Sequence, residues 1–312
     1  MRPLSCVVSV TPNNRSRAPI FIVGCGRSGT TVVYDLLARH PDVAWISNYT
    51  ERWPRFPQLA LLARFKRIAP LRDSTFYLLP APREGFEAWD FYGPTDPAER
   101  NRPLTEADVD AESKRRITYL VETHTRYQGA LRFLNKNTRN SRRIRYLNAI
   151  FEDAIFIHVL RDPRAVVASL LKVHFWADLP LWWMRDLTPH QLIGDGWSRV
   201  EVAAEHWRRC VERLLEDKEV VGPRYRELRY EELTADPVAV LDELCAQVDL
   251  SGPVARNVGG RMDVRSRNDK YKTQLTAGEL EVIAQRAGPL ARKLGYDLAA
   301  DARTLSGQAR DH

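Results

Sequence analysis

The sequence of 312 residues is 44% apolar and 28% charged, a composition that can bury a sizeable core and favours one domain with insertions over two domains. Its formal charge of +7 suits an anionic ligand that carries several negative charges. Nucleic-acid binding is disfavoured, because the basic residues are spread along the chain and no nucleic-acid motif is present.

The spacing of the cysteines argues against a zinc site. Cys6, Cys25, Cys210 and Cys245 lie far apart and form no C-x-x-C pair, which indicates a reducing, cytoplasmic compartment. The seven histidines are scattered, so no metal site is expected.

The sequence also predicts no membrane-spanning helix, because no run approaches the roughly 18 apolar residues that span a bilayer.

The first predicted element is a strand followed by a glycine-rich loop and a helix. Residues 1–17 are interpreted as a weakly structured leader, and residues 20–23 as a strand buried on both faces. The loop 24–29 follows, and residues 30–37 have helical apolar spacing. Glycines let the backbone fold tightly around an oxyanion, and the first N–H groups of the helix then point at it. This stretch therefore predicts a phosphate-binding loop.

The loop 24–31 nearly matches the G-x-x-x-x-G-K-[ST] pattern of nucleoside triphosphatases, but Thr30 stands in place of the lysine. An ATP or GTP site uses that lysine on the outer phosphates. This loop instead offers Arg27, Ser28 and two threonines. We therefore expect it to bind a phosphate but not to transfer a phosphoryl group.

The next segment contains two candidates for a general base. A strand is predicted over residues 43–46, and a proline- and aromatic-rich insertion over residues 49–102. Glu51 lies near its start, as either a base or a solvated loop carboxylate. A helix is predicted over residues 104–127. His124 near its end is either a base, since imidazole titrates near neutrality, or an ordinary helix-surface histidine.

A second landmark follows two further predicted elements. Residues 131–135 read as a short strand, and residues 141–151 as a basic helix. Residues 155–160 form another buried-strand pattern, which ends at Arg161. Asp162 is a natural helix N-cap and Pro163 a natural first helical residue. Arg161 is thus expected at the carboxyl end of a strand, where open α/β sheets bind ligands.

The remaining chain contains a tryptophan-rich insertion over residues 173–197. Three interpretations of this insertion are open: a lid that stacks on an acceptor, a peripheral membrane contact through Trp176, Trp182 and Trp183, or packing against the core. A helix over residues 200–216, a strand over 225–228 and a helix over 275–294 follow. Residues 18–298 are expected to form one domain, and residues 299–312 a polar tail.

The two landmarks together resemble the sulfotransferase family that uses 3′-phosphoadenosine 5′-phosphosulfate (PAPS). In that family a G-x-x-R-S-G-T-[ST] loop holds the 5′-phosphosulfate, and residues 24–31 match it. An R-[DN]-P-R segment with a serine eight residues after its first arginine holds the 3′-phosphate. Residues 161–169 match this segment. The region from Ala18 to about Tyr296 follows the bacterial carbohydrate- and tyrosylprotein-type branch.

The resemblance implies a three-layer P-loop-type α/β fold, with a central, mainly parallel sheet flanked by helices. It implies PAPS as co-substrate, with no metal. It assigns cofactor binding to Arg161, to Ser169, to a basic loop with Arg265, Asn268 and Lys270, and to the phosphate-loop residues Gly26, Arg27, Ser28, Gly29, Thr30 and Thr31.

For catalysis the resemblance places Lys136 at the bridging oxygen of the phosphosulfate and Arg27 beside it. The family's base is a glutamate whose position Asn48 occupies here, so Glu51 is the nearest carboxylate and His124 the other candidate. The acceptor is open among a carbohydrate, a lipid and a secondary metabolite. A P-loop kinase and a non-catalytic nucleotide-binding protein are the alternatives.

Overall fold

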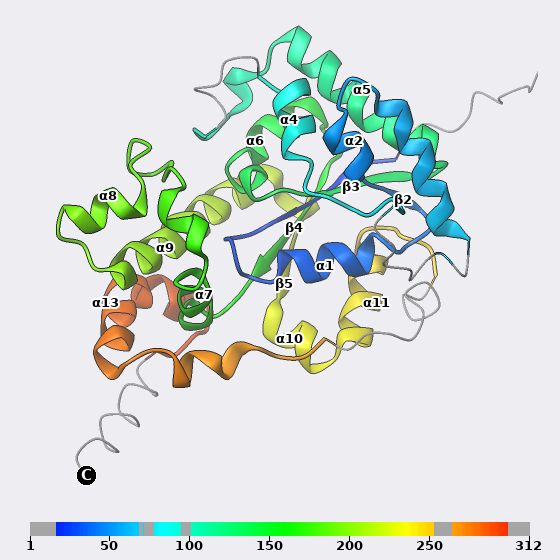
Figure 1. The fold of residues 1–312 in the computed structure, drawn as a ribbon. Coiled ribbons are helices and arrows are strands. Elements are labelled where there is room, and N and C mark those ends of the chain that lie inside the picture. The colour runs from blue at the N-terminus through cyan, green and yellow to red at the C-terminus, as the bar shows by residue number, and fades with distance from the viewer. Residues whose placement is uncertain (1–16, 69–70, 72–77, 95–100, 253–263, 299–312) are drawn as a thin grey trace, which may run out of the picture.

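The computed structural model describes residues 17–68, 71, 78–94, 101–252 and 264–298 (Figure 1). The predicted leader, apart from Arg17, and the predicted tail 299–312 lie outside the described residues.

Five parallel strands form one sheet in the order β2-β3-β1-β4-β5. Ile22 of β1 lies opposite Lys136 of β3 on one side and Ile157 of β4 on the other. Strands that follow β1 in the chain thus lie on both sides of it, which makes the end of β1 a topological switch point. The strands are β1 Ile20–Val23, β2 Val43–Ala44, β3 Arg132–Lys136, β4 Ile155–Leu160 and β5 Tyr225–Arg229.

Helices cover both faces of the sheet (Figure 1), which confirms the expected three-layer α/β fold. One face is covered by α1 Thr30–Leu37, α10 Tyr230–Ala235 and α11 Pro237–Gln247. The other face is covered by α4 Phe86–Tyr92, α5 Ala111–Gln128, α6 Ile144–Ile150 and the end of α9 Arg199–Val221.

Alternation along the central strand explains why this sheet needs two helical layers. Successive side chains of a strand point to opposite faces. Ile20 and Ile22 accordingly pack in the cluster under α1 and α11. Phe21 and Val23 pack in the cluster under α4, α5 and α6, where the Phe21 ring centroid lies 5.6 Å from that of Phe156.

A third cluster lies beside the sheet and supports the ligand-binding edge. It joins α9, α7 Pro163–Leu170 and α13 Ala277–Lys293 around the fully buried Trp207. The smaller elements are α2 Asn48–Arg52, η1 Pro57–Arg67, η3 Glu106–Asp108, η4 Thr138–Arg142, η5 His174–Asp178, α8 Pro189–Gly194, η6 Gly222–Arg224 and η7 Asn268–Thr273.

Several predicted boundaries are wrong for local reasons. The helix expected over 104–127 begins at Ala111, because the Asp110 carboxylate accepts the Ser113 N–H at 2.7 Å and caps it there. The helix expected over 141–151 is split between η4 and α6. The strand expected over 43–46 ends at Ala44. The insertion expected over 49–102 contains most of α2, together with η1 and α4.

Two histidines are fully buried in the core. His124 is fully buried on α5, so its placement on a helix surface is wrong, and its Nδ1 contacts the Leu120 carbonyl oxygen at 2.8 Å. His158 is fully buried on β4, edge-on to the Tyr225 ring. Burial lowers the pKa of each imidazole to about 4, so both are neutral near pH 7.

We predict that His158 makes the fold acid-sensitive and that His158→Phe relieves this sensitivity. Below the unfolded-state pKa of 6.5 the unfolded chain binds a proton that the folded chain does not, until the pH reaches about 4. Stability is therefore lost as the pH falls through this window, by about 2 kcal/mol between pH 7 and pH 5. Urea unfolding of wild type and variant at both pH values measures the difference. The exposed His174→Phe is the control, and an unchanged pH dependence in His158→Phe would contradict the prediction.

Candidate active site

A cavity of about 1500 Å³ opens where β1, β3 and β4 end. Carboxyl ends of parallel strands meet at one edge, and this edge surrounds the switch point beside β1. The loop after β1, Lys136 at the end of β3 and Arg161 after β4 all line the cavity. The sequence landmarks therefore meet in one place.

The loop after β1 is held in a conformation that leaves its peptide groups available. Ser141 from η4 clamps Gly24: the Gly24 N–H donates to Ser141 Oγ, and the Ser141 hydroxyl donates to the Gly24 carbonyl, both at 2.9 Å. Helix α1 has no side-chain cap and no acidic residue in its first turn. Its N-terminus is thus suited to an anion from the cavity.

Arg27 joins the loop to the second motif. Its backbone is left-handed, with φ of 71°, and its Nε donates to Ser169 Oγ on α7 at 3.0 Å. Its carbonyl oxygen accepts a hydrogen bond from Arg161 Nη1 at 2.9 Å. The structure thereby brings together three residues that the sequence predicts to bind the cofactor.

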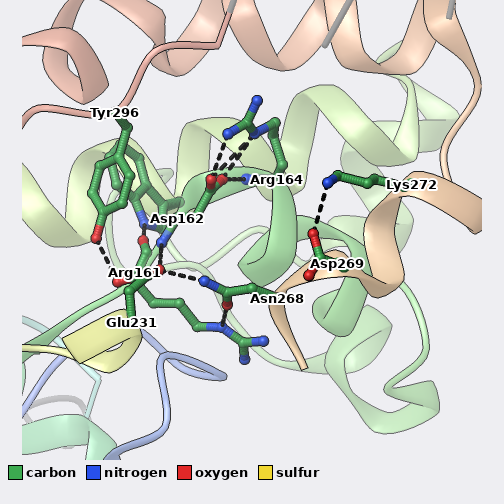
Figure 2. A network of polar contacts seen from close by, with 9 residues as sticks. Arg161, Asp162, Arg164, Glu231, Asn268, Asp269, Lys272 and Tyr296 are labelled. Atoms are coloured by element: carbon green, nitrogen blue, oxygen red, sulfur yellow. Dashed lines mark hydrogen bonds and ion pairs between the residues drawn. The ribbon is translucent and has the colours of Figure 1, made fainter. Parts of the chain in front are cut away.

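Arg161 belongs to a network of polar contacts with Asn268, Glu231 and Tyr296 (Figure 2). Its Nε donates to Asn268 Oδ1 at 2.8 Å, and its guanidinium lies 4.2 Å from the centroid of the Tyr230 ring. Asn268 in turn donates to Glu231 at 2.7 Å, and the Tyr296 hydroxyl donates to the same carboxylate at 3.1 Å. Burial lowers the pKa of Arg161, but an arginine remains charged at neutral pH.

Asp162 fixes the helix that follows Arg161. As expected, its carboxylate caps α7, accepting the Arg164 N–H at 2.8 Å, and Pro163 is the first helical residue. The Asp162 N–H donates to Glu231 at 3.0 Å. The Glu231 carboxylate therefore fixes both the start of α7, through the Asp162 N–H, and Asn268, the side chain that accepts from Arg161.

The cavity wall is strongly basic. Of the predicted basic loop, Arg265 and Lys270 line the cavity, whereas Asn268 positions Arg161. Arg267 of the same loop also lines the cavity. Three further cationic lining residues were not singled out from the sequence, because they belong to no recognisable motif: Arg139 and Arg142 on η4, and Lys172 in the turn after α7.

Lys136 lies in the cavity beside a carboxylate that the sequence did not single out. Its side chain is only 5% exposed and forms an ion pair with Glu84. Asn135 and Asn137 donate to the Glu84 carbonyl at 3.1 and 3.2 Å and fix its backbone. Glu84 Oε2 is buried and has no hydrogen-bond partner among the described residues. Among the described residues that line the cavity, Glu84 is the one carboxylate.

The two base candidates from the sequence lie elsewhere. Glu51 Oε1 accepts the N–H groups of Gly85 and Phe86 at 3.1 and 3.2 Å. It therefore stabilises the start of α4, one residue from Glu84. His124 is sealed in the core against Phe133. Neither is among the described residues of the cavity wall.

The tryptophan-rich segment forms an apolar wall of the cavity. Trp176 and Leu181 are buried there, and Trp182 packs partly buried against the same cluster. Phe175 and Leu179 line the same side and are 69% and 45% exposed. Trp176 thus faces inward, not outward as a membrane contact requires. No helix in the described part of the chain is long and apolar enough to cross a membrane.

We predict that Gly29→Ala destabilises the phosphate loop. Gly29 has φ of 95°, and an added Cβ would lie 2.4 Å from Cδ2 of Tyr230. A non-glycine residue in this left-handed conformation costs about 1 kcal/mol. The added Cβ would also push away the Tyr230 ring, on which the Arg161 guanidinium stacks. The midpoint of thermal unfolding and the affinity for 3′,5′-bisphosphoadenosine should both fall. Gly194→Ala is the control, because a Cβ added there has no atom within 4 Å. Equal losses in the two variants would refute the close packing of Gly29 against Tyr230.

Comparisons with known proteins agree with this geometry. The model of the Sulfotransferase family matches residues 19–253. The omega-hydroxy-beta-dihydromenaquinone-9 sulfotransferase Stf3 of Mycobacterium bovis (strain ATCC BAA-935 / AF2122/97) is 27% identical over 313 residues, which cover 89% of this chain and 75% of the relative.

Solved structures share the fold. Sulfotransferase STF9 from Mycobacterium avium gives a TM-score of 0.51 at 21% identity, covering 89% of this chain and 77% of that one. Sulfotransferase STF1 from Mycobacterium tuberculosis H37Rv gives 0.50 at 17%, covering 88% and 77%. Since the family model spans most of the sequence, the resemblance seen in its two motifs is confirmed, and the chain belongs to the sulfotransferase family.

Proposed function

We propose that the protein transfers the sulfuryl group of PAPS to a hydroxyl group of an apolar small-molecule acceptor. The observation that carries this proposal is the junction of Arg27, Ser169 and Arg161. It joins the phosphate loop to the arginine motif across the switch point of the sheet.

The residues of the cavity fit a co-substrate with two separate anionic groups. An added Cβ at Gly26 would meet nothing within 4 Å, so the loop can receive a 5′-phosphosulfate against residues 26–31. Arg161 and Ser169 would bind the 3′-phosphate through charge-assisted hydrogen bonds. Arg265 and Lys270 would add positive charge from the far side of the cavity.

The bound co-substrate supplies a sulfuryl group on a phosphate leaving group. In the transfer, the acceptor oxygen forms a bond to sulfur while the bond from sulfur to the phosphate oxygen breaks. Lys136 and Arg27 would offset the charge that develops on the leaving phosphate. This role requires Lys136 to turn from Glu84 toward the phosphosulfate, which frees the carboxylate.

Glu84 is the base that the geometry supports best. It shares the cavity with Lys136 and the loop, and its Oε2 has no hydrogen-bond partner in the described part of the chain. Its carboxylate would take the proton that the acceptor hydroxyl loses. Glu51, the base suggested by the sequence, would act indirectly by fixing the turn at Gly85.

The apolar wall supports an apolar acceptor over a carbohydrate. Phe175, Trp176, Leu179 and Trp182 line one side of the cavity, and such a surface favours hydrocarbon over a chain of sugar hydroxyls. The relative from Mycobacterium bovis is named for a hydroxylated menaquinone, which has this character. A cytoplasmic location stays a prediction from the cysteine spacing.

The two alternatives receive less support. A kinase would use a loop lysine where Thr30 stands, and it would leave the contacts of Arg161 without a purpose. A non-catalytic nucleotide-binding protein would not need Lys136 and Glu84 paired inside the cavity.

The first experiment compares binding of 3′,5′-bisphosphoadenosine with binding of ADP and ATP by calorimetry, with and without Mg²⁺. We expect selective, metal-independent binding of the bisphosphate. Arg161→Ala should weaken it roughly 10- to 150-fold, the equivalent of 1.5–3 kcal/mol for a hydrogen bond to a charged group. ADP affinity should change little. The exposed Arg126→Ala on α5 is the control, and equal losses for both nucleotides would refute the 3′-phosphate assignment.

A second experiment separates Glu84 from Glu51. With PAPS and an omega-hydroxylated menaquinone as acceptor, Glu84→Gln should lower turnover roughly 10²- to 10⁴-fold. Affinity for 3′,5′-bisphosphoadenosine should persist, because Lys136 is released rather than lost. Glu51→Gln should act mainly through thermal stability. Full turnover in Glu84→Gln, together with loss of turnover in a stable Glu51→Gln, would return the role of base to Glu51.

A further inference from the structure

A group of reactive side chains lies behind the phosphate loop and has no role in the proposed sulfuryl transfer. Cys25 belongs to the loop, and His206 and Cys210 lie one turn apart on α9. Their sulfur and ring-nitrogen atoms all lie within 4.8 Å of one another. Cys25 and Cys210 are buried, but His206 and Cys210 line the cavity. A small solute in the cavity can therefore reach Cys210.

Trp183 fixes the proton of His206. The indole N–H can only donate, and it contacts Nδ1 of His206 at 3.1 Å. Nδ1 must then accept, so the neutral imidazole carries its proton on Nε2. Nε2 lies 3.6 Å from the Cys210 sulfur, and His206 therefore donates to Cys210.

The two thiols differ in acidity because of this arrangement. The hydrogen bond from Cys25 lowers the pKa of Cys210 well below its usual value, against the opposing effect of burial. His206 and the positive charge of Arg142 act in the same direction as Cys25. The same contact and burial raise the pKa of Cys25. Cys210, which also accepts the hydrogen bond from His206 Nε2, is thus the more acidic thiol of the pair.

A soft metal ion could use the same three atoms, but the tautomer disfavours it. A metal needs the lone pair of Nε2, and that nitrogen carries the proton as long as Trp183 donates to Nδ1. A thiolate beside a second thiol is instead the arrangement of an oxidisable cysteine with its resolving partner.

We propose that Cys25 and Cys210 form a peroxide-sensitive thiol pair whose disulfide disables the phosphate loop. The Cys210 thiolate attacks one oxygen of a hydroperoxide, and the O–O bond breaks. This gives a sulfenic acid, and the leaving oxygen takes up the proton that the Cys210 thiol had lost, which gives an alcohol, or water from hydrogen peroxide. The Cys25 thiol then attacks the sulfenic sulfur, an S–S bond forms and water leaves. Two thiols are oxidised and one peroxide is reduced.

The consequence for the loop follows from its position. Bond formation must bring sulfur atoms that lie within 4.8 Å to about 2 Å, and we expect the loop or α9 to shift as the bond forms. Cys25 stands between Gly24, which Ser141 clamps, and Gly26 of the anion-binding surface. We expect the N–H groups of the loop to lose their common orientation.

The test uses the full chain in a Cys6→Ser background, treated with hydrogen peroxide. Peptide mass mapping should show residues 25 and 210 linked, with the loss of two hydrogens, and dithiothreitol should reverse the link. Cys25→Ser should leave a Cys210 sulfenic acid that dimedone traps. Cys210→Ser should prevent both products. Cys245→Ser, on α11 and outside the cavity wall, is the control and should behave like the parent.

Two measurements report the state of the phosphate loop after oxidation. Affinity for 3′,5′-bisphosphoadenosine should fall at least tenfold on oxidation, and hydrogen exchange of residues 20–37 should increase. The exchange and mapping results do not depend on the proposed co-substrate, so failure of the parent to bind the nucleotide would count against the proposed co-substrate alone. The thiol proposal is overturned if Cys245 reacts before Cys210, if the disulfide leaves loop exchange unchanged, or if Zn²⁺ binds the reduced protein tightly and protects both thiols.

Discussion

The Arg161 guanidinium connects three parts of the molecule that are distant in sequence. It donates to the Arg27 carbonyl of the phosphate loop, donates to Asn268 near the C-terminal helix, and stacks on Tyr230 after the last strand. A buried charge of this kind is costly unless polar groups surround it. The loop, α10 and η7 must therefore pack together for the charge to be tolerated, and the cavity between them is formed by the same requirement.

The buried charge of Lys136 is compensated differently from that of Arg161, by an ion pair with Glu84. Lys136 is almost fully buried at the end of β3 and has its charge balanced by one carboxylate. The pair joins the sheet to the segment before α4, which Glu51 also stabilises. Because each partner compensates the other, an anion that attracts Lys136 also changes the environment of Glu84. In the proposed transfer, electrostatics would thereby couple substrate binding to release of the carboxylate.

Local patterns identified much of the fold and the loop. Buried strands, the capping residue Asp162 and the glycine spacing are set by neighbours in sequence, so they can be read from it. Glu84 could not be found in this way, because its place beside Lys136 depends on pairing between residues 47 and 82 and on the side-chain amides of Asn135 and Asn137. His124 was misplaced because helical spacing does not show that Phe133 covers that face of α5. The cluster of Cys25 and Cys210 requires α9 to cross behind the loop, and no spacing between residues 185 positions apart reveals it.

The Ser141 clamp also bears on how such a loop can be reused in protein engineering. One hydroxyl both accepts from and donates to the backbone of Gly24, and it comes from the connection after β3, not from the loop's own strand or helix. Grafting the eight loop residues into another parallel sheet would leave a peptide N–H and carbonyl without their partner. The smallest transferable unit is therefore two adjacent strand ends, with the turn after the second strand included.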